Sequence, residues 1–140
     1  MKQYKRILVL LEGLAVRQEV IQYAVALAQR INARITLLML LPNEAGAGSA
    51  GVDPVGQGEI ILEQETKRLA GSGVPVQYEV IRGDPRSELI KFMATNLSFD
   101  TAVWGGDPVA LRPGSSHLPD HWISTIGKQL ACPLVAPTRR

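Results

Sequence analysis

The chain has 140 residues, of which 46% are hydrophobic and 20% are charged. This balance is typical of one folded domain, spanning 1–140, and excludes disorder along most of the chain. Lysine and arginine number 15 and aspartate and glutamate 13, so the net charge is +2. Because the basic residues are scattered, we expect no nucleic-acid partner.

The sequence contains one cysteine, Cys132, which excludes an internal disulfide framework and fits a reducing compartment. The apolar run from Ile7 ends at Glu12, and the run from Ile35 ends at Pro42. Both runs are far shorter than the roughly 20 residues that span a bilayer, and the first is too short for a signal peptide. We therefore expect a cytoplasmic protein with no membrane partner.

Short apolar runs alternate with longer amphipathic stretches, a pattern typical of strand, helix, strand units around a parallel sheet. Strands are predicted over 6–11, 34–41, 76–82, 101–104 and 132–136, and helices over 17–31, 59–69, 85–97 and 120–130. The first strand is almost continuously aliphatic, as expected when helices cover both faces of the sheet. The predicted fold class is therefore α/β, an open, doubly wound, five-stranded parallel sheet of the Rossmann-like type.

Local signals mark several ends of these elements. Asn32 closes the first helix, and Pro42 ends the second strand by removing a backbone donor. Asp84 is placed to cap the third helix, with Pro85 at its first position. The predicted buried stripe of that helix is Leu89, Ile90, Met93 and Leu97.

Two glycine-containing stretches are predicted to be loops. Residues 43–58 contain five glycines and are expected to form a mobile surface loop. Residues 105–119 contain three glycines and three prolines and are the expected functional loop. In doubly wound sheets, ligands bind beyond the carboxyl ends of the strands where the strand order reverses. The loop over 12–16 and the loop over 105–119 are therefore the candidates for a binding crevice.

Four segments, in this order and spacing, resemble the universal stress protein family, and the similarity covers essentially the whole chain. They are the first strand through Glu12-Gly13, the turn Gly83-Asp84-Pro85, the strand from Asp100 to Gly105, and the closing strand from Ala131 to Val135. The resemblance implies the strand order 3-2-1-4-5, with strands one and four adjacent. It also implies a stress-response or signalling role.

Nucleotide-binding members of that family hold ATP with a glycine, two residues, a second glycine, nine residues, then glycine and serine or threonine. Such glycines let backbone amides approach phosphates. Here the first glycine is Gly105, but the second position is Pro108. The final pair falls on Leu118-Pro119 or, counted back from the closing strand, on Asp120-His121. Neither pair supplies glycine and serine, so the comparison with this motif disfavours tight ATP binding.

Side chains around the predicted crevice also bear on a nucleotide. The resemblance places the family's nucleoside-contacting aspartate at Glu12 and its adenine contact at Leu40. Asp107 puts negative charge near the phosphates, which opposes anion binding. A rearranged loop in which Gly114 and Ser115 supply donors would favour it. The candidate nucleotide-binding residues are Glu12, Leu40, Gly105, Gly106, Gly114 and Ser115.

Several of these residues have a simpler interpretation. Glu12 is either a nucleoside ligand or a general base or, more simply, a solvated or helix-capping carboxylate at a strand end. Gly105 and Gly106 either admit a phosphate or end the strand with a positive φ. A metal site is not expected, because the possible ligands His117, Asp120 and His121 lack a fourth partner. The side chains expected to serve packing are Trp104, Trp122 and Cys132.

Two functional hypotheses follow, from different classes. The first is a non-enzymatic homodimer that signals through another protein, with subunits joined by the short apolar edge strand of Pro133, Leu134, Val135 and Ala136. The second is an ATP-binding switch or slow ATPase that uses the loops after strands one and four. A hydrolase is disfavoured because Ser115 and Ser116 lack the strand, nucleophile, helix elbow. A response-regulator receiver needs paired acidic residues where this chain has Leu11-Glu12.

Overall fold

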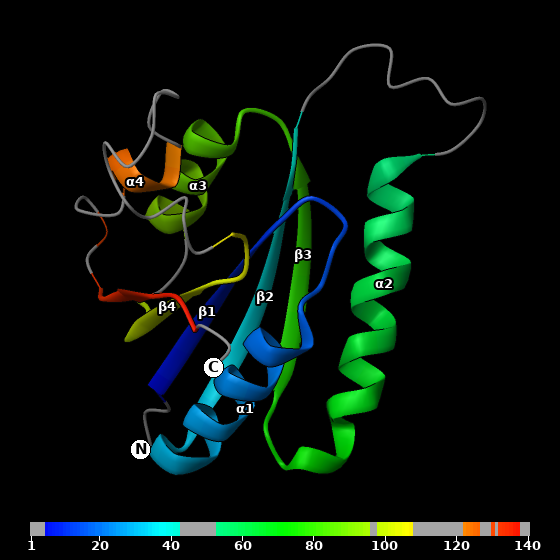
Figure 1. Ribbon diagram of the computed structural model, residues 1–140, viewed down its shortest axis with the longest axis vertical. Coiled ribbons are helices and arrows are strands. Elements are labelled where there is room, and N and C mark those ends of the chain that lie inside the picture. The colour runs from blue at the N-terminus through cyan, green and yellow to red at the C-terminus, as the bar shows by residue number, and fades with distance from the viewer. Residues whose placement is uncertain are drawn as a thin grey trace.

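The computed structural model describes residues 5–42, 53–95, 98–107, 122–126, 130 and 132–137. In chain order the elements are β1 (Lys5–Glu12), α1 (Gln18–Ile31), β2 (Ala33–Leu41), α2 (Pro54–Arg68), η1 (Leu69–Ser72), β3 (Val76–Arg82), α3 (Pro85–Thr95), β4 (Thr101–Trp104), α4 (Trp122–Ile126) and β5 (Leu134–Val135). The strands form one parallel sheet in the order β3-β2-β1-β4-β5, which confirms the predicted fold class and strand order. The central strand is therefore β1, and β3 and β5 lie at the two edges (Figure 1).

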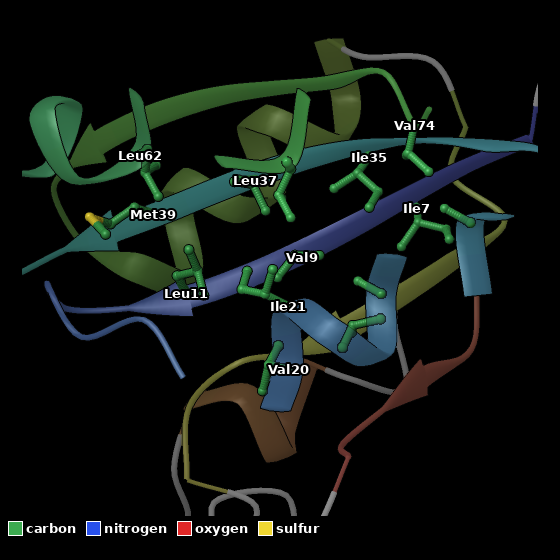
Figure 2. Packing of buried hydrophobic residues seen from close by; sticks show 14 of the residues in the cluster. Ile7, Val9, Leu11, Val20, Ile21, Ile35, Leu37, Met39, Leu62 and Val74 are labelled. Carbon is green, nitrogen blue, oxygen red and sulfur yellow. The ribbon is translucent and has the colours of Figure 1, made fainter. Parts of the chain in front are cut away.

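Alternate residues of the central strands supply a hydrophobic core on each face of the sheet. On β1, Ile7 and Val9 pack on the side of α1 and α2, while Leu8 and Leu10 pack on the side of α3 and α4. All four side chains are fully buried. Figure 2 shows the first of these cores, where side chains of β1 and β2 meet those of α1 and α2. Burial on both faces explains the nearly continuous apolar runs in the sequence.

The predicted helix ends at Asn32 and Asp84 are confirmed. Asn32 takes the left-handed conformation, with φ of 58°, at the end of α1. The Asp84 carboxylate accepts hydrogen bonds from the Ser87 hydroxyl at 2.7 Å and the Ser87 backbone N–H at 3.1 Å. These bonds lower the pKa of Asp84 below its ordinary value, because they favour the charged carboxylate.

The second helix begins earlier than the sequence analysis predicts. The Asp53 side chain accepts from the Val55 backbone N–H at 3.1 Å, and Pro54 occupies the first turn, so α2 starts at residue 54. The predicted loop over 43–58 is therefore wrong for its last residues, while residues 43–52 lie outside those described. An aspartate followed by proline is the same start signal that marks α3.

Gly58 gives the early turns of α2 a close approach to the sheet. A Cβ atom at this position would lie 2.9 Å from the Met39 sulfur and 3.2 Å from a Val80 methyl carbon. The glycine that suggests a loop in the sequence is thus required by the packing of a helix on β2 and β3. Packing overrides the low helix propensity of glycine here.

The buried stripe of α3 is also corrected. Leu89 is fully buried as predicted, but Ile90 is 48% exposed and Phe92 takes its place in the core at 5% exposure. Met93 packs partly against the same core, whereas Leu97 lies outside the described residues. Positions three and four apart share a helix face, so a stripe through Leu89 includes residues 92 and 93 and leaves 90 at its margin.

The last predicted strand is shorter than expected, and the predicted helix before it is described only in part. The predicted helix over 120–130 is seen as α4, and apart from Leu130 its other residues lie outside the described part of the chain. The predicted strand over 132–136 is reduced to the two residues of β5. The Pro133 carbonyl accepts from the Ala102 N–H at 2.9 Å, but proline has no N–H of its own to donate to β4. Prolines at 133 and 137 therefore limit the ladder with β4.

Among the helices that the structure describes, none combines the length and the apolar character that a membrane crossing needs.

Candidate functional site

The strand order changes direction between β1 and β4. A pocket of about 370 Å³ lies at the carboxyl ends of these two strands. This is where a doubly wound sheet is expected to hold a ligand. The pocket is lined by Glu12, Ala15, Arg17, Gly105, Gly106 and Asp107. The structure thus brings Glu12, Gly105 and Gly106 together, as the sequence analysis expects.

Glu12 is the last residue of β1 and is half-buried at the pocket wall. Its Oε2 accepts a hydrogen bond of 3.0 Å from the indole Nε1 of Trp122, the first residue of α4. Trp122 in turn packs edge-on against Trp104, with ring centroids 5.8 Å apart and an interplanar angle of 80°. The Glu12 carboxylate, which is expected to contact a ligand, therefore forms its hydrogen bond with one member of the Trp104–Trp122 pair instead.

Arg17 is a pocket residue that the sequence analysis does not identify. It precedes α1, and its Nη1 donates to the Gly106 carbonyl at 2.7 Å. Its Nη2 lies 3.2 Å from the Glu19 carboxylate, in an ion pair whose side chains are about one-third exposed. The guanidinium therefore ties the segment after β1 to the segment after β4. Sequence spacing gives no signal for this contact, since the two residues are 89 positions apart.

The two glycines after β4 are required by packing. The Gly105 N–H donates to the Leu10 carbonyl at 2.6 Å, so this amide belongs to the sheet. A Cβ atom on Gly105 would lie 2.7 Å from the same carbonyl oxygen, and one on Gly106 would lie 2.5 Å from the Trp104 ring. The alternative of a positive φ is wrong, because the described glycines with positive φ are Gly13, Gly73 and Gly83.

Asp107 is the last described residue of the segment that follows β4. Its carbonyl accepts from the Trp104 indole N–H at 2.8 Å, and its side chain is exposed at the pocket. Among the described lining residues, Glu12 and Asp107 thus place two carboxylates in the pocket wall beside the Arg17 guanidinium. This charge distribution favours neither a phosphate nor another polyanion.

Leu40 does not line this pocket. It lies opposite Glu12 in the ladder of β1 and β2, but its side chain is 2% exposed and belongs to the core shared with Leu8 and Trp104. Its carbonyl accepts from the Gly13 N–H at 3.1 Å. A contact between adenine and the Leu40 side chain would therefore need that side chain to leave the core.

The remaining predicted residues of the glycine loop, Gly114 and Ser115, lie outside the described residues, as do Pro108, His117, Asp120 and His121. The described residues contain no group of three or more histidine, cysteine, aspartate or glutamate side chains placed to hold a metal ion.

Cys132 is buried beneath the α3–α4 side of the sheet. Burial raises the pKa of its thiol, and the nearby Asp100 carboxylate raises it further. The thiol is therefore protonated and unreactive near neutral pH, in agreement with the predicted packing role.

The sequence matches the model of the universal stress protein family over residues 3–105. The match covers most of the chain and ends at Gly105, the first position of the glycine loop. None of the curated proteins matches this sequence significantly.

Solved structures share the fold. A universal stress protein family member from Burkholderia pseudomallei aligns over 97% of each chain with 19% identity and a TM-score of 0.66. The universal stress protein UspA from Lactobacillus plantarum aligns over 99% of this chain and 100% of its own, with 19% identity and a TM-score of 0.65. A universal stress protein in complex with cAMP aligns over 98% and 99% of the two chains, with 14% identity and a TM-score of 0.64.

Proposed function

Because the chain belongs to the universal stress protein family, we propose that it is a cytoplasmic, non-enzymatic stress-response module, a homodimer that does not bind ATP tightly. Its output is an interaction with another protein. The main observation behind this proposal is that polar groups of the crevice already form hydrogen bonds within the chain.

Three crevice groups that a nucleotide would use are already bonded within the chain. The Glu12 carboxylate accepts from Trp122, the Arg17 guanidinium donates to the Gly106 carbonyl, and the Gly105 amide donates to Leu10. A triphosphate would have to break these bonds or find other donors. Leaving a buried polar group without a partner costs about 1–3 kcal/mol.

Charge acts in the same direction. Two unit charges 4 Å apart in water interact by about 1 kcal/mol, and by more where solvent is excluded. Glu12 and Asp107 would each repel a triphosphate, whereas Arg17 attracts it while already paired with Glu19. The balance of these interactions supports a crevice that rejects polyanions.

The dimer proposal rests on the edge position of β5. Ala102 pairs with Leu134 and donates to the Pro133 carbonyl. Neighbouring residues of a strand turn their amides to opposite sides, so Leu134 and then Ala136 turn their N–H and C=O groups to the open edge. In an antiparallel pair centred on Val135, Leu134 would exchange both hydrogen bonds with the partner's Ala136.

Equilibrium dialysis with labelled ATP and magnesium tests the nucleotide part of the proposal. We expect no saturable binding at millimolar nucleotide. Saturable binding that is lost in Arg17→Ala and kept in Arg86→Ala, an exposed arginine outside the crevice, would show a functional nucleotide site and overturn this part.

Sedimentation velocity tests the dimer. Ala136→Pro removes one N–H from the open edge of β5, and we expect it to shift the protein from dimer to monomer at micromolar concentration. Val76→Pro, at the opposite edge of the sheet, is the matched control and leaves the dimer intact. A wild-type monomer, or a dimer unaffected by Ala136→Pro, contradicts the proposed interface.

A nucleotide-binding switch is the second candidate. It is favoured by the pocket at the carboxyl ends of β1 and β4, which contains Arg17, and by the solved relative in complex with cAMP. A crevice of this size and mixed charge accommodates a monophosphate more readily than a triphosphate. Dialysis with labelled cAMP beside ATP distinguishes the two candidates.

A further inference from the structure

The amino end of the central sheet carries an arginine whose surroundings differ from those of the crevice. Arg6 is the second residue of β1, opposite Arg34 on β2. Because side chains alternate along a strand, Arg6 lies on the same face as Leu8 and Leu10, the side of α3 and α4. It is therefore at the opposite end of β1 from Glu12.

An aromatic side chain fixes the position of the Arg6 guanidinium. Its Cζ lies 4.6 Å from the centroid of the Phe99 ring, within the range of a cation–π contact. Phe99 stacks against Phe92, with centroids 6.0 Å apart and an interplanar angle of 18°. The guanidinium thus rests on a buried aromatic pair, which leaves its planar edge, with the N–H donors, for other partners.

The charge of Arg6 has no carboxylate partner within 4.0 Å in the described part of the chain. The Asp100 carboxylate uses its Oδ2 to accept from the Arg6 backbone N–H at 2.8 Å. The Nη1 atom of Arg6 is buried and makes no hydrogen bond to any described residue. A buried charged donor without an acceptor is unfavourable, and native proteins usually supply its partner.

A second cation lies beside this donor. Arg34 is the direct neighbour of Arg6 on the adjacent parallel strand, and neighbouring strands lie about 4.8 Å apart. Like charges at this spacing repel each other, and an anion placed between them would reverse the sign of the interaction. Arg34 is exposed and Arg6 is half-buried, so part of each side chain is open to solvent, while the Arg6 Nη1 atom itself is buried.

We propose that Arg6, with Arg34 beside it, binds an oxyanion, a phosphate or a carboxylate group, at the amino end of the sheet. A guanidinium presents its donors as a planar fork that matches both anions. A small rotation of the half-buried side chain brings Nη1 to the ligand, which satisfies the donor that now lacks an acceptor. This site is separate from the crevice, so it does not depend on the proposed function.

Nuclear magnetic resonance of ¹⁵N-labelled arginine side chains tests the site, with inorganic phosphate and acetate as probes at constant ionic strength. We expect the Arg6 N–H signals to shift saturably with a dissociation constant on the order of 1 mM, the affinity of a small charge-assisted contact. Arg6→Gln weakens binding by about tenfold or more, and Arg86→Gln leaves it unchanged. The tighter-binding probe identifies the anionic group.

Thermal unfolding gives a second measurement, which keeps the test valid if Arg6→Gln folds poorly. In chloride buffer, we expect Arg6→Met to be at least as stable as the wild type, because it removes an uncompensated charge from a partly buried position. Added phosphate or acetate raises the unfolding temperature of the wild type but not that of Arg6→Met.

Two results would overturn the proposal. One is the absence of a saturable shift of the Arg6 signals with either probe. The other is an equal stabilisation of the wild type and Arg6→Met by the oxyanions, which would show that the effect does not involve this side chain.

Discussion

The charged side chains at the two ends of β1 differ in whether their polar atoms find hydrogen-bond partners within the described residues. At the carboxyl end, Glu12 and Arg17 line the pocket at the point where ligands bind in doubly wound sheets, yet both form hydrogen bonds within the chain. At the amino end, where no ligand is expected from the fold, Arg6 has a buried N–H without an acceptor among the described residues. Position in the fold therefore marks a possible site, while buried donors and acceptors without partners show whether a ligand is needed there.

The largest expected effect comes from closing the space at the carboxyl end. Gly105→Ala places a Cβ atom 2.7 Å from the Leu10 carbonyl and from a Leu11 methyl carbon, and neither backbone strand can move freely. We expect a loss of about 1–3 kcal/mol in the free energy of unfolding, measured by chemical denaturation. Gly71→Ala, which meets no atom within 4 Å, is the control and should change stability by less than about 0.5 kcal/mol. Equal stability of the two variants would contradict the packing role of Gly105.

A smaller effect is expected from the bond that engages Glu12. Trp122→Phe keeps an aromatic ring against Trp104 but removes the N–H that donates to the carboxylate. Because Glu12 is half-buried and water can replace part of the bond, we expect a loss of about 1 kcal/mol. A double-mutant cycle with Glu12→Gln measures the coupling by urea denaturation. Additivity within about 0.3 kcal/mol would mean that the bond contributes nothing in solution.

The smallest effect concerns Asp84, another carboxylate at this end of the sheet that is bonded within the chain. The Ser87 hydroxyl and N–H lower the pKa of Asp84 in the folded state. A lowered folded pKa contributes stability above the unfolded pKa, and this is lost as the pH falls through the folded value. The wild type should thus exceed Asp84→Asn in stability near neutral pH, with the difference shrinking under acid conditions in pH-dependent unfolding. A difference that stays constant down to the lowest pH would show that the charge of Asp84 does not matter.

Much of the fold follows from patterns in the sequence. The aliphatic runs of β1 and β2 and the cap at Asp84 predict elements that the structure confirms, since both depend on neighbouring residues alone. The sequence predictions are wrong where contacts between residues far apart in the chain determine the local structure. Gly58 belongs to a helix because it packs against Met39 and Val80, and Ile90 is exposed because Phe92 fills the core instead.

The site was predictable in position and less so in composition. Glu12, Gly105 and Gly106 meet at the pocket because the carboxyl ends of adjacent parallel strands converge. The bonds from Arg17 to Gly106 and from Trp122 to Glu12 are not predicted by the sequence, since they join residues 89 and 110 positions apart. The sequence shows only that Arg17 precedes the first helix and that Trp122 lies in the last one. Neither position specifies the partner of the side chain.

The indole N–H resonances of Trp104 and Trp122, the two tryptophans of the chain, show whether the polar groups of the crevice stay hydrogen-bonded within the protein when nucleotide is added. In a titration of the wild-type protein with ATP and magnesium, we expect both resonances to keep their positions, because the bond from Trp122 to Glu12 persists. A saturable shift of the Trp122 resonance, absent in Arg17→Ala, would show that a nucleotide enters the crevice and breaks that bond.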